Sequence, residues 1–143
     1  MPLKLVEEFI QIMAEEKVIF YHSPDDEWES CTAMKNAMIG YSISEFNFAD
    51  PDFLNACYHI TPEAKHYMGI TLILGHEIGH WKTKNKWANK KLQKEYWQAV
   101  EDATPESYPF IPLELDATKW GITWILNHKD IVSKFEQEIV MKL

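Results

Sequence analysis

The sequence predicts an α+β fold: one domain, residues 1–143, in which a small sheet packs on a central buried helix. A chain of this length is able to bury a core of its own. The helix is expected from Pro62 to about Trp81, because Thr61 supplies a capping hydroxyl and the residues that follow are apolar nearly all round. Residues 18–21 and 57–60 have the aromatic and β-branched composition of short strands.

The remaining elements are expected from local patterns. Residues 27–50 combine helical and alternating spacing, so their secondary structure stays open. Three further helices are expected, from Pro2 to Lys17, from Pro112 to near Asn127 and from Asp130 to about Met141. The polar segment 82–94 is either a connection or the start of another helix that continues to Glu101.

Composition excludes several classes of function. The net charge is −8, and all 14 basic residues are lysines, which argues against nucleic-acid binding. No apolar run approaches the length of a membrane span, and the acidic start lacks the basic flank of a signal peptide. Cys31 and Cys57 are too far apart for a C-x-x-C site and are expected to be free thiols. We therefore expect a cytoplasmic protein with neither a nucleic-acid nor a membrane partner.

The most informative motif is His76-Glu77-Ile78-Gly79-His80, within the central apolar helix. Residues four apart share one face of a helix, so His76 and His80 can present two imidazoles to one metal ion. This is the H-E-x-x-H arrangement of zinc metallopeptidases, in which the glutamate is the general base. Glu77 is therefore the expected catalytic residue, taking a proton from the attacking water and passing it to the leaving amine.

A catalytic zinc ion usually has three protein ligands, so one more is needed. The best candidate is Glu114, in the first turn of the helix that Pro112 opens. Asp116 is the second candidate, and we expect it instead to orient a histidine ring from outside the ligand set. The expected metal ligands are therefore His76, His80 and Glu114, holding one Zn²⁺ ion.

These residues together resemble the gluzincin metallopeptidases. The H-E-x-x-H motif is followed 34 residues later by Glu114-x-x-Ala117, and in those families the glutamate of Glu-x-x-Ala-(Asp/Asn) is the third zinc ligand. A short chain of this kind is most similar to the ImmA/IrrE group, whose members often cut repressor proteins, or to a minimal gluzincin. The resemblance covers roughly residues 56–125 and implies a zincin-like fold with Ala117 packed beneath the site. It departs at Thr118, where the families have Asp or Asn.

The other candidate residues have plainer alternatives. Two core imidazoles would be the alternative to metal ligation, but Glu77 would then be buried without a partner. His66 lies too far along the helix from His80 to share a metal, and His59 is expected at the end of a strand near the site. Tyr108 is the candidate donor to an oxyanion, although it is equally consistent with a core aromatic that anchors its loop.

The expected function is therefore that of a zinc metalloendopeptidase acting on an intracellular protein, such as a regulator or repressor. An extended substrate would add to a sheet edge, for which residues 57–60 are the candidate. Two alternatives stay open. One is a zincin-scaffold binding or inhibitor protein of phage or mobile-element type. The other is a latent peptidase whose C-terminal helix, residues 130–143, covers the cleft.

Overall fold

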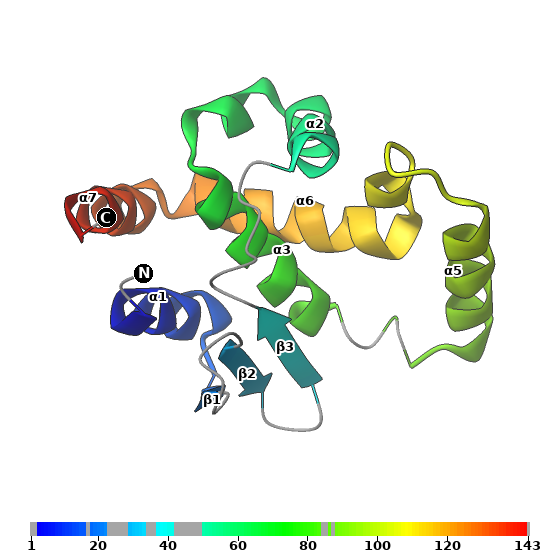
Figure 1. The fold of residues 1–143 in the computed structure, drawn as a ribbon, viewed down its shortest axis with the longest axis horizontal. Coiled ribbons are helices and arrows are strands. Elements are labelled where there is room, and N and C mark those ends of the chain that lie inside the picture. The colour runs from blue at the N-terminus through cyan, green and yellow to red at the C-terminus, as the bar shows by residue number, and fades with distance from the viewer. Residues whose placement is uncertain are drawn as a thin grey trace.

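The computed structural model describes residues 3–16, 18–22, 29–33, 37–41, 50–83, 86 and 88–142. Helices form most of this part of the chain, and the two that carry the candidate ligands cross at its centre (Figure 1). In chain order the elements are α1 (Leu3–Ala14), β1 (Val18–His22), β2 (Glu29–Ala33), β3 (Ala37–Tyr41), α2 (Pro51–Ile60), the 3₁₀ helix η1 (Pro62–His66), α3 (Gly69–Lys82), α5 (Lys90–Asp102), the 3₁₀ helix η2 (Tyr108–Phe110), α6 (Pro112–Asn127) and α7 (Lys129–Lys142).

The expected α+β class is wrong, because helices build both the core and the site. Helices supply the described main core, with fully buried side chains such as Ile10, Leu74, Ile78 and Ile125. The described strands are three five-residue segments in the antiparallel order β1-β2-β3, with Cys31 opposite both Phe20 and Ile39. The fold is thus essentially helical, with this small meander beside the end of α3 (Figure 1).

The strand expected at residues 57–60 is instead the second half of α2. Asp50 caps this helix by accepting a hydrogen bond from the Asp52 N–H at 3.0 Å, and Pro51 occupies its first turn. Cys57 is fully buried in the main core. Capping and burial together override the β-propensity of a four-residue segment. Residues 57–60 therefore offer no sheet edge to a substrate.

Helices α3 and α6 pack with their backbones in contact through small residues. A Cβ atom added to Gly79 would lie 2.1 Å from the Ala117 carbonyl oxygen, and one added to Gly121 would lie 2.4 Å from the Gly75 carbonyl carbon. Glycine in a helix costs about 1 kcal/mol of stability relative to alanine. At these positions that cost is offset by the close approach of the two helix backbones. The packing fixes the motif helix against the helix that carries Glu114.

The C-terminal helix α7 holds the start of α3. Met68, the N-cap residue of α3, makes no side-chain capping bond. Instead, the Glu136 carboxylate accepts hydrogen bonds from the Met68 N–H at 2.7 Å and from the Thr71 hydroxyl at 2.6 Å. A negative side chain at this end also interacts favourably with the helix dipole. Because α3 begins at Gly69, the Thr61 signature caps the separate 3₁₀ helix η1 and does not start the motif helix, contrary to the prediction.

Several other expectations agree with the structure. The helix from Pro112 to Asn127 is found with those bounds, and α1 and β1 lie within or close to the ranges expected for them. Asp130 lies in the first turn of α7, where it does not serve as the cap. No helix of the described segments has the length and apolarity that crossing a bilayer requires.

Candidate metal centre

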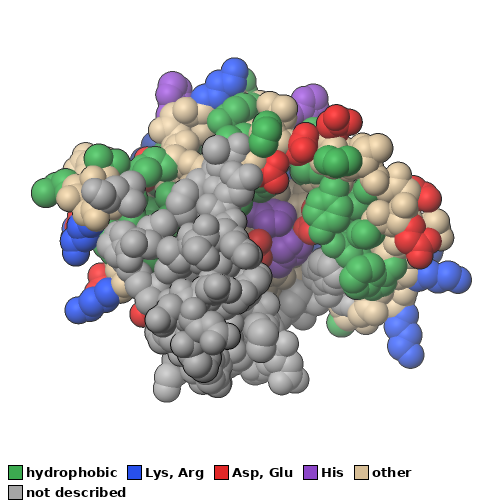
Figure 2. Space-filling model, in the orientation of Figure 1, with side chains coloured by type: hydrophobic (Ala, Val, Ile, Leu, Met, Phe, Trp, Pro, Cys, Tyr) green, Lys and Arg blue, Asp and Glu red, His purple; other side chains and the backbone are tan. Residues whose placement is uncertain are grey.

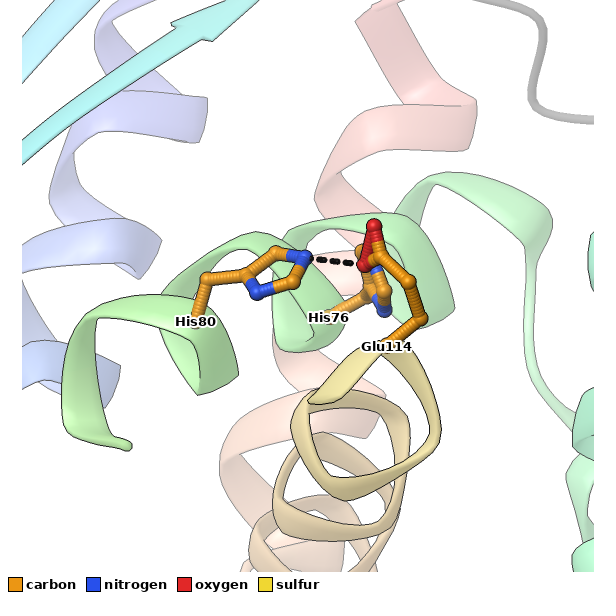
Figure 3. Close-up of side chains that lie close together, drawn as sticks. All are labelled: His76, His80 and Glu114. Carbon is orange, nitrogen blue, oxygen red and sulfur yellow. Dashed lines mark ion pairs between the residues drawn. The ribbon is translucent and has the colours of Figure 1, made fainter. Parts of the chain in front are cut away.

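The three expected metal ligands come together where α3 crosses the start of α6. His80 Nε2 lies 2.6 Å from Glu114 Oε2, and His76 Nε2 lies 3.6 Å from the same oxygen. One ligand atom from each residue lies within 4.8 Å of the other two. In Figure 3, both rings from α3 face the carboxylate of Glu114.

These distances fit a zinc ion. Tetrahedral zinc with bonds of about 2.1 Å places neighbouring ligand atoms about 3.4 Å apart, and 2.6 and 3.6 Å lie on either side of that value. In addition, Glu114 is buried, and its Oε2 atom lies between the two imidazoles. A buried carboxylate is costly unless a cation or hydrogen-bond donors compensate its charge. The site could therefore hold one divalent metal ion.

The other oxygen of Glu114 is held by two tyrosines. Tyr108 donates a hydrogen bond to Glu114 Oε1 at 2.8 Å, Tyr96 lies 3.3 Å from the same atom, and the two hydroxyls are 3.1 Å apart. These donors fix the carboxylate so that only Oε2 faces the histidines. Sequence reasoning missed Tyr96, which comes from α5, because nothing in its local pattern separates it from an ordinary core tyrosine.

Thr118 orients His76. Its hydroxyl lies 2.8 Å from His76 Nδ1 and also 3.1 Å from the Glu114 backbone carbonyl oxygen. A carbonyl only accepts, so the single hydroxyl proton goes to Glu114 and the oxygen accepts from Nδ1–H. This tautomer leaves the Nε2 lone pair free for a metal. Thr118 therefore supplies a supporting hydrogen bond at the position where the gluzincin families have Asp or Asn.

Asp116 does not perform the supporting role that the sequence analysis assigns to it. Its carboxylate pairs with Lys86 Nζ at 2.9 Å, on a partly exposed surface. Residues four apart share a helix face, so Thr118 lies on the face of Glu114, toward α3, while Asp116 lies on another. The i, i+4 spacing between Glu114 and Thr118 is therefore the sequence signal that identifies Thr118, and not Asp116, as the residue that orients a histidine ring.

Burial and neighbouring charges shift the pKa values of the three candidate ligands in different directions. Burial, reinforced by the neighbouring His80, lowers the pKa of His76 to about 4, so this imidazole is neutral at pH 7. For His80 burial acts in the same direction, but hydrogen bonding and attraction to Glu114 outweigh it and raise the pKa. For Glu114 burial is outweighed by the two histidines and Tyr108, and its pKa is lowered. The carboxylate is thus held in the charged form that binds cations.

Glu77 lines the same cleft as His76 and Glu114. Burial raises its pKa to about 7, with repulsion from Glu114 adding to the effect and His80 opposing it. A carboxyl group with a pKa near neutrality is suited to both accepting and releasing a proton.

The cleft in front of the site has a volume of about 320 Å³. In Figure 2, histidine side chains lie in a hollow, with hydrophobic side chains along one side and acidic ones close by. Its lining comes from α2, α3, the 105–109 loop and α6: Asp50, Asp52, Phe53, Ile73, His76, Glu77, Pro105, Tyr108, Pro109 and Glu114. No residue of α7 is among them, so within the described chain the C-terminal helix does not cover the cleft as the latent-peptidase alternative requires.

The remaining candidates lie outside the ligand set. His59 is on α2 with its ring against Phe110, and His66 is at the end of η1. Tyr108 both lines the cleft and binds Glu114, so its role as an oxyanion donor stays a prediction. Cys57 is a buried free thiol, whereas the side chain of Cys31 lies outside the described residues.

A scan against protein-family models and searches of the curated proteins and of the solved structures found no match to this chain. The resemblance to gluzincins therefore stays a prediction from the motif residues.

Proposed function

We propose that the chain is a zinc-dependent metalloendopeptidase of gluzincin type, acting on a protein of the cytoplasm such as a regulator. One observation carries the proposal: ligating atoms of His76, His80 and the buried Glu114 lie together, and His76 and Glu114 line a cleft that Glu77 also lines. A purely structural metal site has no need of a carboxylate beside its ligands. The buried free thiol of Cys57 supports a reducing compartment.

In this proposal His76, His80 and Glu114 would hold the ion, with Thr118 and the two tyrosines keeping the ligands oriented. A bound zinc ion would supply Lewis acidity and an acidified water. Glu77 accepts the proton of the water that attacks the scissile carbonyl and returns it to the leaving amine.

The test measures zinc content and cleavage of an unfolded protein such as reduced casein. Wild type is expected to bind one zinc ion and to cleave. Glu77→Gln should keep the ion and lose roughly 10²-fold to 10⁴-fold in rate, the usual contribution of a general base. Glu95→Gln, at an exposed glutamate of α5, is the matched control and should behave as wild type.

Two results would contradict the proposal. Equal inactivity of zinc-loaded wild type and Glu77→Gln would favour the binding or inhibitor protein instead. Full zinc affinity in Glu114→Ala would show that the third ligand is assigned wrongly, since removal of one of three ligands should weaken binding strongly.

A further inference from the structure

One wall of the cleft, at the start of α2, carries two aspartates that the proposed chemistry does not use. Asp50 is the N-cap residue of α2 and Asp52 lies in its first turn. Both are half-buried, and both line the cleft together with Glu77 and Glu114. Four carboxyl groups therefore face one cavity.

No described residue forms an ion pair that balances the charge of these aspartates. In addition, no described lysine lines the cleft. A divalent ion at the candidate centre would offset the charges of Glu77 and Glu114. Two negative charges would then remain at the α2 wall, where low-dielectric surroundings strengthen their field.

Two further features point to an occupant of a particular kind. The buried carboxylate of Glu114, only 6 % exposed, lines this same cleft, so the aspartates lie beside the candidate metal centre. Phe53 and Ile73 add apolar surface to the lining. A side chain with an apolar stem and a cationic end matches that combination, because its stem covers the apolar surface while its charge meets the carboxylates.

We infer that the cleft selects peptides with a lysine or arginine side chain near the scissile bond, whose cation is bound by Asp50 and Asp52. This inference rests on the proposed function, since it names the substrate class of the same site. A free amino terminus is a cation of the same chemistry, so the test includes a separate arm for it.

The test uses fluorogenic decapeptides of one base sequence, acetylated at the amino terminus, with Lys, Gln or Glu placed at each position in turn. Wild type should show, at one position, a kcat/KM for Lys about tenfold above that for Gln, a size typical of two partly exposed charge pairs. Asp50→Asn/Asp52→Asn should abolish this preference, and the amide oxygen that Asp50→Asn introduces can still cap α2. Asp102→Asn/Asp130→Asn removes two exposed charges outside the cleft and should retain it.

Binding of the same peptides to zinc-loaded Glu77→Gln separates this inference from the proposed function. Suppose that Lys peptides bind more tightly than Gln peptides, that this difference depends on both aspartates, and that wild type cleaves none of them. This result would retain the inference and refute the proposed peptidase activity. Cleavage without any Lys preference, or with a preference that survives Asp50→Asn/Asp52→Asn, would overturn the inference and retain the peptidase. A preference seen only with free amino termini would also overturn it.

Discussion

The two ends of the motif helix α3 are held in different ways. Its start is held by polar contacts, because the Glu136 carboxylate from α7 accepts two hydrogen bonds there. Its second half is held by close packing, with Gly79 against the Ala117 backbone of α6. The histidines lie in that second half. Close packing therefore sets the ligand geometry, whereas the polar end contributes mainly to the stability of the fold.

Gly79→Ala should have the largest effect, because its Cβ would lie 2.1 Å from a backbone oxygen that has little freedom to move. We expect a loss of about 3 kcal/mol in the free energy of unfolding and weaker zinc binding, since overpacking separates α3 from α6. Chemical denaturation and zinc titration measure the two effects. Gly75→Ala is the graded control: its Cβ would lie 3.1 Å from Gly121 Cα, so its effect should be smaller. Equal effects of both changes would contradict this account.

Thr118→Val should come next and should affect the metal more than the fold. It keeps the shape of the side chain and removes the oxygen that accepts from His76 Nδ1–H. Loss of such an outer hydrogen bond weakens metal binding about 10-fold to 100-fold. Competition with a chelating dye measures the affinity. Thr83→Val, which removes a hydroxyl bonded to a backbone carbonyl at the end of α3, is the control and should leave affinity nearly unchanged.

Glu136→Ala should show the opposite pattern at the polar end. It leaves the fully buried Thr71 hydroxyl and the Met68 N–H without their acceptor, which should cost about 2 kcal/mol of stability. Zinc affinity of the folded protein should change little, because the ligands lie in the other half of α3. Glu138→Ala, with only a long 4.0 Å pair to Lys134, is the control on the same helix. A large loss of zinc affinity in Glu136→Ala would remove the distinction between the two ends.

Tyr96→Phe should have a small effect on both stability and zinc affinity. Tyr108 still donates to Glu114 Oε1 at 2.8 Å, whereas the Tyr96 contact is longer, at 3.3 Å. We expect less than about a threefold change in affinity, below the usual value of one neutral hydrogen bond. Tyr108→Phe should lose more. The reverse order would show that the shorter contact is not the one that holds the carboxylate.

The sequence is most informative where one short pattern determines one local structure. The i, i+4 spacing of His76 and His80 and the early position of Glu114 identify a cluster that the fold does bring together. Pro112 likewise marks the start of α6. In these cases the helix period alone decides which side chains share a face.

The sequence misleads where distant contacts decide the outcome. Residues 57–60 have strand composition, yet capping at Asp50 and burial of Cys57 make them helical. The contribution of Tyr96 depends on how α5 lies against Glu114, which no local pattern encodes. The α+β expectation fails for the same reason, because tertiary packing outweighs short-range propensity.

The backbone contact between α3 and α6 has a consequence for how this protein could be redesigned or could diverge. Gly79 and Gly121 admit no larger side chain without moving a helix, so substitution there is constrained by the ligand geometry. The α2 wall, with Asp50 and Asp52, lies outside that contact. Asp52 can change without altering that contact, whereas Asp50 also caps α2. Under the proposed function, a change of specificity at this wall would therefore leave the contact that positions the ligands intact.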